Sequence, residues 1–217
     1  GTIRGGANSN LAIGGTGNFG TLNFTAGGQT LYNFTINRTS AGNVILGTPV
    51  TVSTAYTHTN GTFNLNGQTL TLNGVITFPI SASNGSFSGS TTSSLIIGGA
   101  GAITNNMFMT QSGTASYFNN MTFNRAAQTI TLGNTLNLYG TLTPTAGTFA
   151  SNGNLVLIAT SPGVVASIAT IAGSVTGNVK VQSSAKGGNT GWPTMGSAGI
   201  TGRTFSDWDA NITVTCL

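Results

Sequence analysis

A long internal repeat constrains the fold of this chain more than any other feature of its sequence. Phe34-Thr-Ile-Asn-Arg38 is matched by Met121-Thr-Phe-Asn-Arg125, and Gly61-Thr-Phe63 is matched by Gly147-Thr-Phe149, about 86 residues later in each case. This unit is longer than the roughly 20–50 residues that are usual for solenoid repeats, so each copy should contain several coils. We expect two copies, at about 11–94 and 95–172.

Within each copy, apolar and polar residues alternate over short stretches, a pattern that indicates β-strands. Examples are Val50-Thr-Val52, Phe63-Asn-Leu65 and Leu136-Asn-Leu138. Five Asn-Gly pairs separate such stretches, and both residue types readily adopt the positive φ of tight turns. Thr, Val and Ile make up 64 of the 217 residues, which also favours strands because β-branched side chains fit a pleated surface.

These patterns predict an all-β fold, a parallel β-solenoid (β-helix) of short strands over residues 1–182. A β-sandwich is the alternative, because it also consists of many short strands. A membrane barrel fits less well, since its strands need roughly 9–11 residues with an apolar outer band. Residues 161–173 leave two interpretations open. Ser161-Pro162 resembles a helix start, but the segment equally fits a loop followed by a β-branched strand.

The near absence of charge excludes several classes of function. Charged residues are 4% of the chain, against about 25% in an ordinary domain, and the only acids are Asp207 and Asp209. Solenoid hydrolases use paired carboxylates, and calcium sites use clustered ones, so we predict no enzyme, no cofactor and no metal. The six Lys and Arg residues are scattered, which argues against nucleic acid. The sequence contains no run of about 18 apolar residues, so we predict no transmembrane segment.

The character of the sequence changes after residue 182. Residues 183–217 are rich in Gly and contain both Trp residues, both acids and the single Cys. We interpret this segment as a cap, because the terminal units of a solenoid must cover its exposed end. We expect cap contacts from Arg203, Asp207, Trp208 and Asp209, and contacts with a neighbouring subunit from Ile212, Val214 and Cys216 in a final strand.

The single histidine and two of the arginines are further functional candidates. His58 is the only histidine and cannot form a metal site alone, so we expect an exposed turn residue. Asn37-Arg38 and Asn124-Arg125 occupy corresponding positions in the two copies. Each Arg could be an outward docking group, or it could end a strand with its stem over apolar surface; we prefer the second interpretation.

The first copy resembles a known group of proteins. Asn33-Phe-Thr-Ile-Asn-Arg38, Val44-Ile-Leu-Gly-Thr-Pro-Val-Thr-Val52 and the run from Gly61 to Gly74 are similar to the repeats of secreted surface proteins of the Bacteroidetes. Gly177-Asn-Val-Lys-Val181 is similar to the segment that often follows those repeats, although Trp192-Pro193 stands where the family usually has Trp-Arg. The resemblance implies an extracellular or cell-surface module, exported by the type IX route, and it implies no activity.

We therefore expect a non-enzymatic, extracellular structural module. It would be a subunit of a self-assembling filament or surface fibre, or an adhesin stalk, with copies of itself or a larger surface protein as partners. The alternative is a module that binds carbohydrate, such as surface glycans, or ice through Thr and Asn arrays. Thr-x-Thr recurs, for example at 69–71, 129–131 and 141–143, but the irregular spacing argues against one regular array.

Overall fold

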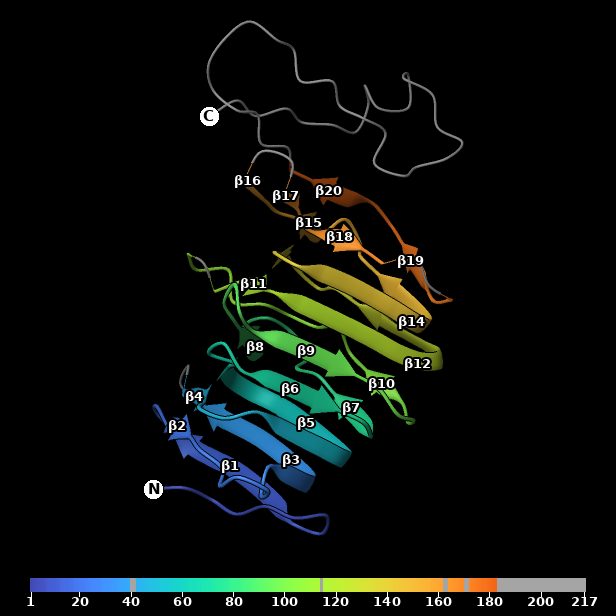
Figure 1. Ribbon diagram of the computed structural model, residues 1–217. Coiled ribbons are helices and arrows are strands. Elements are labelled where there is room, and N and C mark those ends of the chain that lie inside the picture. The colour runs from blue at the N-terminus through green and yellow to red at the C-terminus, as the bar shows by residue number, and fades with distance from the viewer. Residues whose placement is uncertain (40–41, 114, 162–163, 170–171, 183–217) are drawn as a thin grey trace, which may run out of the picture.

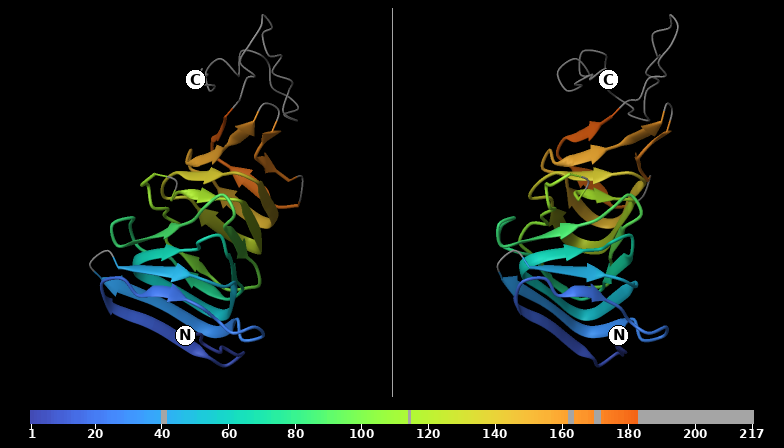
Figure 2. Two further views of the ribbon diagram at one scale, coloured as in Figure 1. Left: turned by 60° about the vertical axis from the view of Figure 1, so that its left-hand side comes forward. Right: turned by 90° about the vertical axis from the view of Figure 1, so that its left-hand side faces the viewer.

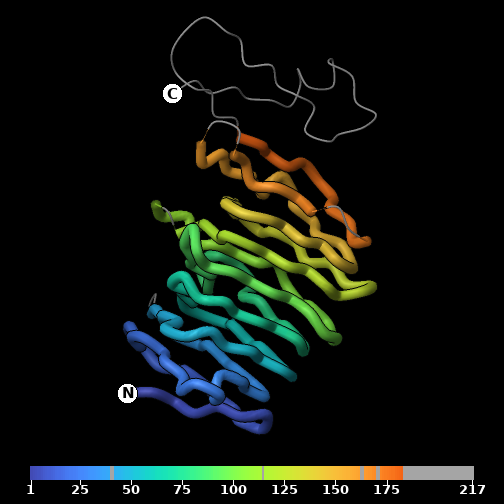
Figure 3. Tube along the Cα trace, in the orientation of Figure 1, coloured from blue at the N-terminus to red at the C-terminus, as the bar shows by residue number. Residues whose placement is uncertain are grey.

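The computed structural model describes residues 1–39, 42–113, 115–161, 164–169 and 172–182. These residues form a β-solenoid of about seven turns, stacked along one axis from the N-terminus (Figure 1). The tube trace follows the same succession of layers (Figure 3). The prediction of a parallel β-solenoid is confirmed. The β-sandwich alternative is wrong, because among the described residues only β16 and β17 pair in the antiparallel sense.

Twenty strands make up the described part of the coil, as follows. The first ten are β1 (Asn10–Thr16), β2 (Gly20–Leu22), β3 (Thr30–Thr39), β4 (Asn43–Leu46), β5 (Val50–Asn64), β6 (Thr69–Leu72), β7 (Val75–Thr77), β8 (Gly85–Ser88), β9 (Ser94–Ile97) and β10 (Ile103–Thr104). The others are β11 (Tyr117–Phe118), β12 (Asn120–Thr131), β13 (Leu136–Leu138), β14 (Thr141–Ala150), β15 (Leu155–Leu157), β16 (Ala159–Ser161), β17 (Val164–Val165), β18 (Ser167–Ile168), β19 (Ser174–Thr176) and β20 (Val179–Val181).

Apart from the β16–β17 hairpin, the strands pair in parallel with strands of the neighbouring coils. The main sheet runs β1-β3-β5-β6-β9-β12-β14-β18, and a second sheet runs β11-β13-β15-β20. The register advances by 19 residues where Leu136 meets Leu155 and by 27 where Ile76 meets Ile103. The four longest strands, β3, β5, β12 and β14, have 10 to 15 residues. In the two rotated views, such strands bend as they wrap around the coil (Figure 2).

The core lies inside the coil, because the alternation of the strands sends every second side chain inward. Inward residues of successive coils meet in columns, of which one contains Val50, Leu70, Leu95, Met121 and Leu142. All five are at most 2% exposed. Full burial of such a side chain contributes about 1.5–3 kcal/mol. The stacking of apolar columns is therefore the main source of stability for strands that are individually too short to persist.

Both copies of the sequence repeat use the same strand pairing, which confirms the repeat character of the architecture. β1 pairs with β3 as β9 pairs with β12. The copies nevertheless lie at different positions around the coil. Four coils lead from Leu11 through Phe34, Tyr56 and Ile76 to Ile103, which is 103 − 11 = 92 residues. The sequence repeat of about 86 residues is shorter than these four coils, so the second copy begins at an earlier position around the coil than the first.

For residues 161–173 the sequence allowed either a helix or a loop followed by a strand, and the described residues of this segment decide between the two. β16, β17 and β18 occupy this stretch, and residues 164–169 contain no helix. Val164 is 55% exposed, so an apolar helical face is not buried here. The loop-and-strand interpretation is correct for residues 164–169, whereas Pro162 and Ile171 lie outside the described residues.

Candidate functional site

The predicted cap and subunit contacts all fall in one terminal segment. Arg203, Asp207, Trp208, Asp209, Ile212, Val214 and Cys216 lie outside the described residues, with the whole of 183–217. Their roles stay predictions. Because Asp207 and Asp209 are the only acids, residues 1–182 carry no carboxylate side chain.

His58 is not an exposed turn residue, and that prediction was wrong. It lies on β5 with no exposed surface, and its ring nitrogen Nε2 is 2.8 Å from the carbonyl oxygen of Gly61. Its ring packs edge-on against Phe87, at 5.6 Å between centroids. Burial lowers the pKa of His58 to about 4, and the bond to Gly61 opposes this shift only in part. His58 is thus a neutral member of the core.

Two polar atoms in this part of the core are left without hydrogen bonds. The Tyr56 hydroxyl and His58 Nδ1 are buried, and neither has a partner among the described residues. Burial raises the pKa of Tyr56 well above its usual value. The two side chains alternate with Thr57 on one strand and face the same interior. Period-two alternation from Tyr56 was the signal that could have placed His58 inside.

Arg38 and Arg125 are buried structural residues, so neither is an outward docking group. Arg125 is 1% exposed, and its guanidinium donates to the carbonyl oxygens of Gly98, Gly101 and Leu72. Arg38 donates in the same way to Gly14, Thr16 and Gly17. Each Arg donates to backbone oxygens of the preceding coil, where a Gly-Gly pair lets the chain turn, and Arg125 also reaches Leu72, two coils before it. The guanidinium is buried along with the stem, which the preferred interpretation did not anticipate.

β12 bulges directly after Arg125. Asn124 pairs with Ala146 and Thr129 with Thr148, so β12 has three more residues than β14 between these pairs. The additional residues include Ala127, whose φ of 56° is unusual for a residue other than Gly. The bulge lets the Arg side chain fold inward while the backbone passes around it.

The most regular outward feature is a row of threonines on the main sheet. We call it the long row; it consists of Thr30, Thr51, Thr71, Ile96, Thr122 and Thr143, each paired with the next across successive coils. Five of the six are Thr, and all six are half-buried. The Thr-x-Thr motifs do not form one array, because 69–71 and 141–143 lie on this part of the sheet whereas 129–131 pairs with 148–150 further along β12 and β14. The long row is in register because turns of different length absorb the differences in sequence spacing.

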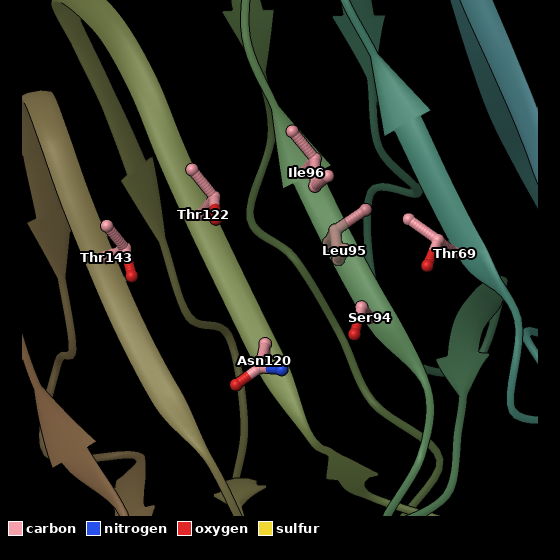
Figure 4. A pocket seen from close by; sticks show the side chains of 7 residues that line it. All are labelled: Thr69, Ser94, Leu95, Ile96, Asn120, Thr122 and Thr143. Carbon is pink, nitrogen blue, oxygen red and sulfur yellow. The ribbon is translucent and has the colours of Figure 1, made fainter.

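A second row, the short row, runs beside the long row two residues earlier on each strand. It consists of Thr69, Ser94, Asn120, Thr141 and Ser167. The Asn120 side chain accepts a hydrogen bond of 2.8 Å from the Thr141 amide, which continues the row between β12 and β14. We call the two rows together the threonine face, and Figure 4 shows the side chains in its middle.

A hollow of about 330 Å³ lies on the threonine face. Its lining consists of Thr69, Ser94, Leu95, Ile96, Asn120, Thr122 and Thr143 (Figure 4). None of these side chains titrates near neutral pH, so the hollow offers hydroxyl, amide and methyl groups and no acid–base chemistry. Such a surface can bind through shape and hydrogen bonds.

Other polar ladders cover other parts of the coil. Thr35, Thr57 and Thr77 stack in register on β3, β5 and β7. Asn60 donates from its side-chain amide to Asn37 at 2.8 Å and accepts from Asn84 at 3.3 Å. These ladders hold the coils together without charge, which explains how a chain with few ionic residues forms an ordered surface.

Comparisons with known proteins assign this chain to no family. No family model, curated protein or solved structure matches the sequence. Within the described ranges, no three His, Cys, Asp or Glu side chains gather as metal ligands. No helix in the described part of the chain could cross a lipid bilayer. The fold and its surface define a β-solenoid with neutral polar ladders.

Proposed function

We propose that this chain is a non-enzymatic, extracellular structural module, which forms a surface fibre by stacking coil upon coil. The observation that carries the proposal is the continuous ladder along one axis. Each coil satisfies the backbone hydrogen bonds of the coil before it, from β1 to β18 in the main sheet. A fold that grows by adding similar layers is suited to extension, either within a longer surface protein or between copies.

The use of the charged and titratable groups supports the same role. Arg38, Arg125 and His58 are buried and bind backbone oxygens inside the coil, and the surface ladders consist of Thr, Ser and Asn. With so little charge, electrostatic repulsion between subunits is weak. The resemblance to repeat-rich secreted proteins of the Bacteroidetes favours a cell-surface location, in agreement with this role.

The edge of β1 is the place where stacking would continue. β1 pairs with β3 through all seven of its residues, from Asn10 to Thr16. Its other edge faces no strand among the described residues. An uncovered strand edge is a template for pairing with another strand, either a preceding coil of the same protein or a coil of a neighbouring copy.

Assembly can be tested with the full chain by light scattering and negative-stain electron microscopy over a range of concentrations. We expect filaments whose axial repeat equals one subunit. Ala12→Lys places a charge on the β1 edge and should suppress them, because an edge Lys blocks strand addition. Ala82→Lys, in an exposed turn, is the matched control and should assemble normally. Monomers at every concentration would contradict self-assembly, as would equal behaviour of the two variants.

A further inference from the structure

The threonine face supports an inference that does not depend on the proposed role in a surface fibre. Its side chains are uncharged and nearly all are short, and five of the long row and two of the short row are Thr. β-branched side chains have few rotamers, and cross-strand bonds fix several further. Thr141 Oγ1 lies 3.3 Å from Ser167 Oγ, and Asn120 binds the Thr141 amide. The face is therefore a preorganised lattice of hydroxyl and methyl groups.

The size of this lattice argues against a protein partner. Five steps between strands give the long row a length of about 24 Å, and the two rows are about 6.6 Å apart. Even with generous margins the face covers roughly 300 Å², well below the ~800 Å² per partner of a stable protein interface. It also contains no aromatic or charged anchor of the kind that concentrates binding energy in protein interfaces. A periodic, neutral partner fits it better.

The periodicity suits water in a tetrahedral lattice. Hydrogen-bonded oxygens about 2.75 Å apart in tetrahedral order place second neighbours about 4.5 Å apart. Neighbouring strands place equivalent side chains about 4.8 Å apart along each row, within a few tenths of an ångström of that value. Across the rows the match is looser, about 6.6 Å against about 7.3 Å for the stacking repeat of the same water lattice. The rows therefore match ordered water best along the solenoid axis.

We propose that the threonine face binds the surface of ice. The hydroxyls of the long row would continue the hydrogen bonds of the lattice, and the γ-methyls, including that of Ile96, would fill its cavities. Ser94, Ile96 and Asn120 interrupt the Thr pattern in the middle of the face, where the hollow lies. These interruptions make the site weaker than an uninterrupted array, and they provide positions at which binding can be increased.

The test is adsorption of the fluorescently labelled full chain to a growing ice surface, together with thermal hysteresis. Wild type should adsorb. Thr122→Lys puts a long charged side chain in the centre of the face and should abolish adsorption. Thr62→Lys is the control, because Thr62 is equally half-buried but pairs with Asn43 and Ser86 on another part of the coil. It should adsorb like wild type. Circular dichroism of both variants establishes that each is folded.

A gain-of-function variant keeps the proposal testable if Thr122→Lys fails to fold. Ile96→Thr completes the long row and should increase thermal hysteresis over wild type. Exclusion of the folded wild type from ice would overturn the proposal, as would equal loss in Thr122→Lys and Thr62→Lys. Adsorption to crystalline cellulose without adsorption to ice would also overturn it, and would identify the face as a glycan surface.

Discussion

At the scale of single residues, the sequence pattern holds more information than residue type alone. Arg38 and His58 are polar residues that a composition argument places at the surface. Period-two alternation places Arg38 on the same side as Phe34 and Ile36, and all three are buried. The buried groups persist because backbone carbonyls receive the Arg donors and because His58 is neutral. Their cost to stability, and its dependence on pH, can be measured.

Removing the buried guanidinium should destabilise the solenoid. Arg125→Met leaves the carbonyl oxygens of Gly98 and Gly101 without their donor, at a net cost of about 2 kcal/mol in the free energy of unfolding. Arg125→Lys retains the charge but not the fork of donors, so we expect a smaller loss. Urea unfolding measures both. Arg4→Met removes one charge from an exposed position and should be nearly neutral; an equal loss there would contradict this account of Arg125.

His58 should make stability depend on pH in a defined window. Its pKa falls from an ordinary 6.5 to about 4 in the folded state, so between these values the unfolded chain binds more protons. Stability is full above pH 6.5 and falls as the pH drops towards 4, by about 3 kcal/mol in total. Below about pH 4 the contribution of His58 is constant. The physical cause is that protonation adds a charge and a second donor inside an apolar core.

Chemical denaturation at a series of pH values tests this expectation. His58 is the only histidine of the chain, and His is the side chain whose ordinary pKa lies between pH 5 and 8, so we expect His58 to dominate between pH 5 and 7. His58→Phe should abolish most of the slope in that interval. A variant that keeps the slope of wild type would show that another group causes it.

At the scale of the strands, the sequence predicted the type of structure but not its register. Alternation and turn residues such as Asn66-Gly67, where both residues have positive φ, are local signals, so the short strands could be recognised. Register depends on the number of residues in each coil, which ranges from 19 to 27. For this reason Thr71 and Thr122, which are 51 residues apart, could not be placed on one row from the sequence.

Close approach between coils makes some glycines indispensable. A Cβ on Gly74 would lie 1.8 Å from the carbonyl oxygen of Thr54, on the strand of the preceding coil. Gly74→Ala must therefore push β5 and the β6–β7 turn apart, and we expect a loss of about 1–3 kcal/mol. A Cβ on Gly14 meets only the Asn37 oxygen, at 3.8 Å. Thermal unfolding should show a larger fall in Tm for Gly74→Ala than for the control Gly14→Ala. An equal fall in Tm would contradict the close packing.

At the scale of the whole molecule, the chain is a stack in which neighbouring layers are distant in sequence. The fold class followed from the repeat. The rotation of the second copy around the coil did not, because it results from the difference between the 86-residue repeat and the 92 residues of four coils. Both proposals, the fibre and the ice-binding face, depend on this stacking order along one axis.

The most direct test of the stacking order is a distance between spin labels at the two ends of the long row. Thr30→Cys and Thr143→Cys, in a Cys216→Ser background that removes the only native thiol, are five coil steps apart. Pulsed electron spin resonance should give a narrow distribution centred at about 24 Å, five times the spacing between strands. A broad distribution, or one centred near half or twice that distance, would contradict the parallel solenoid and its register.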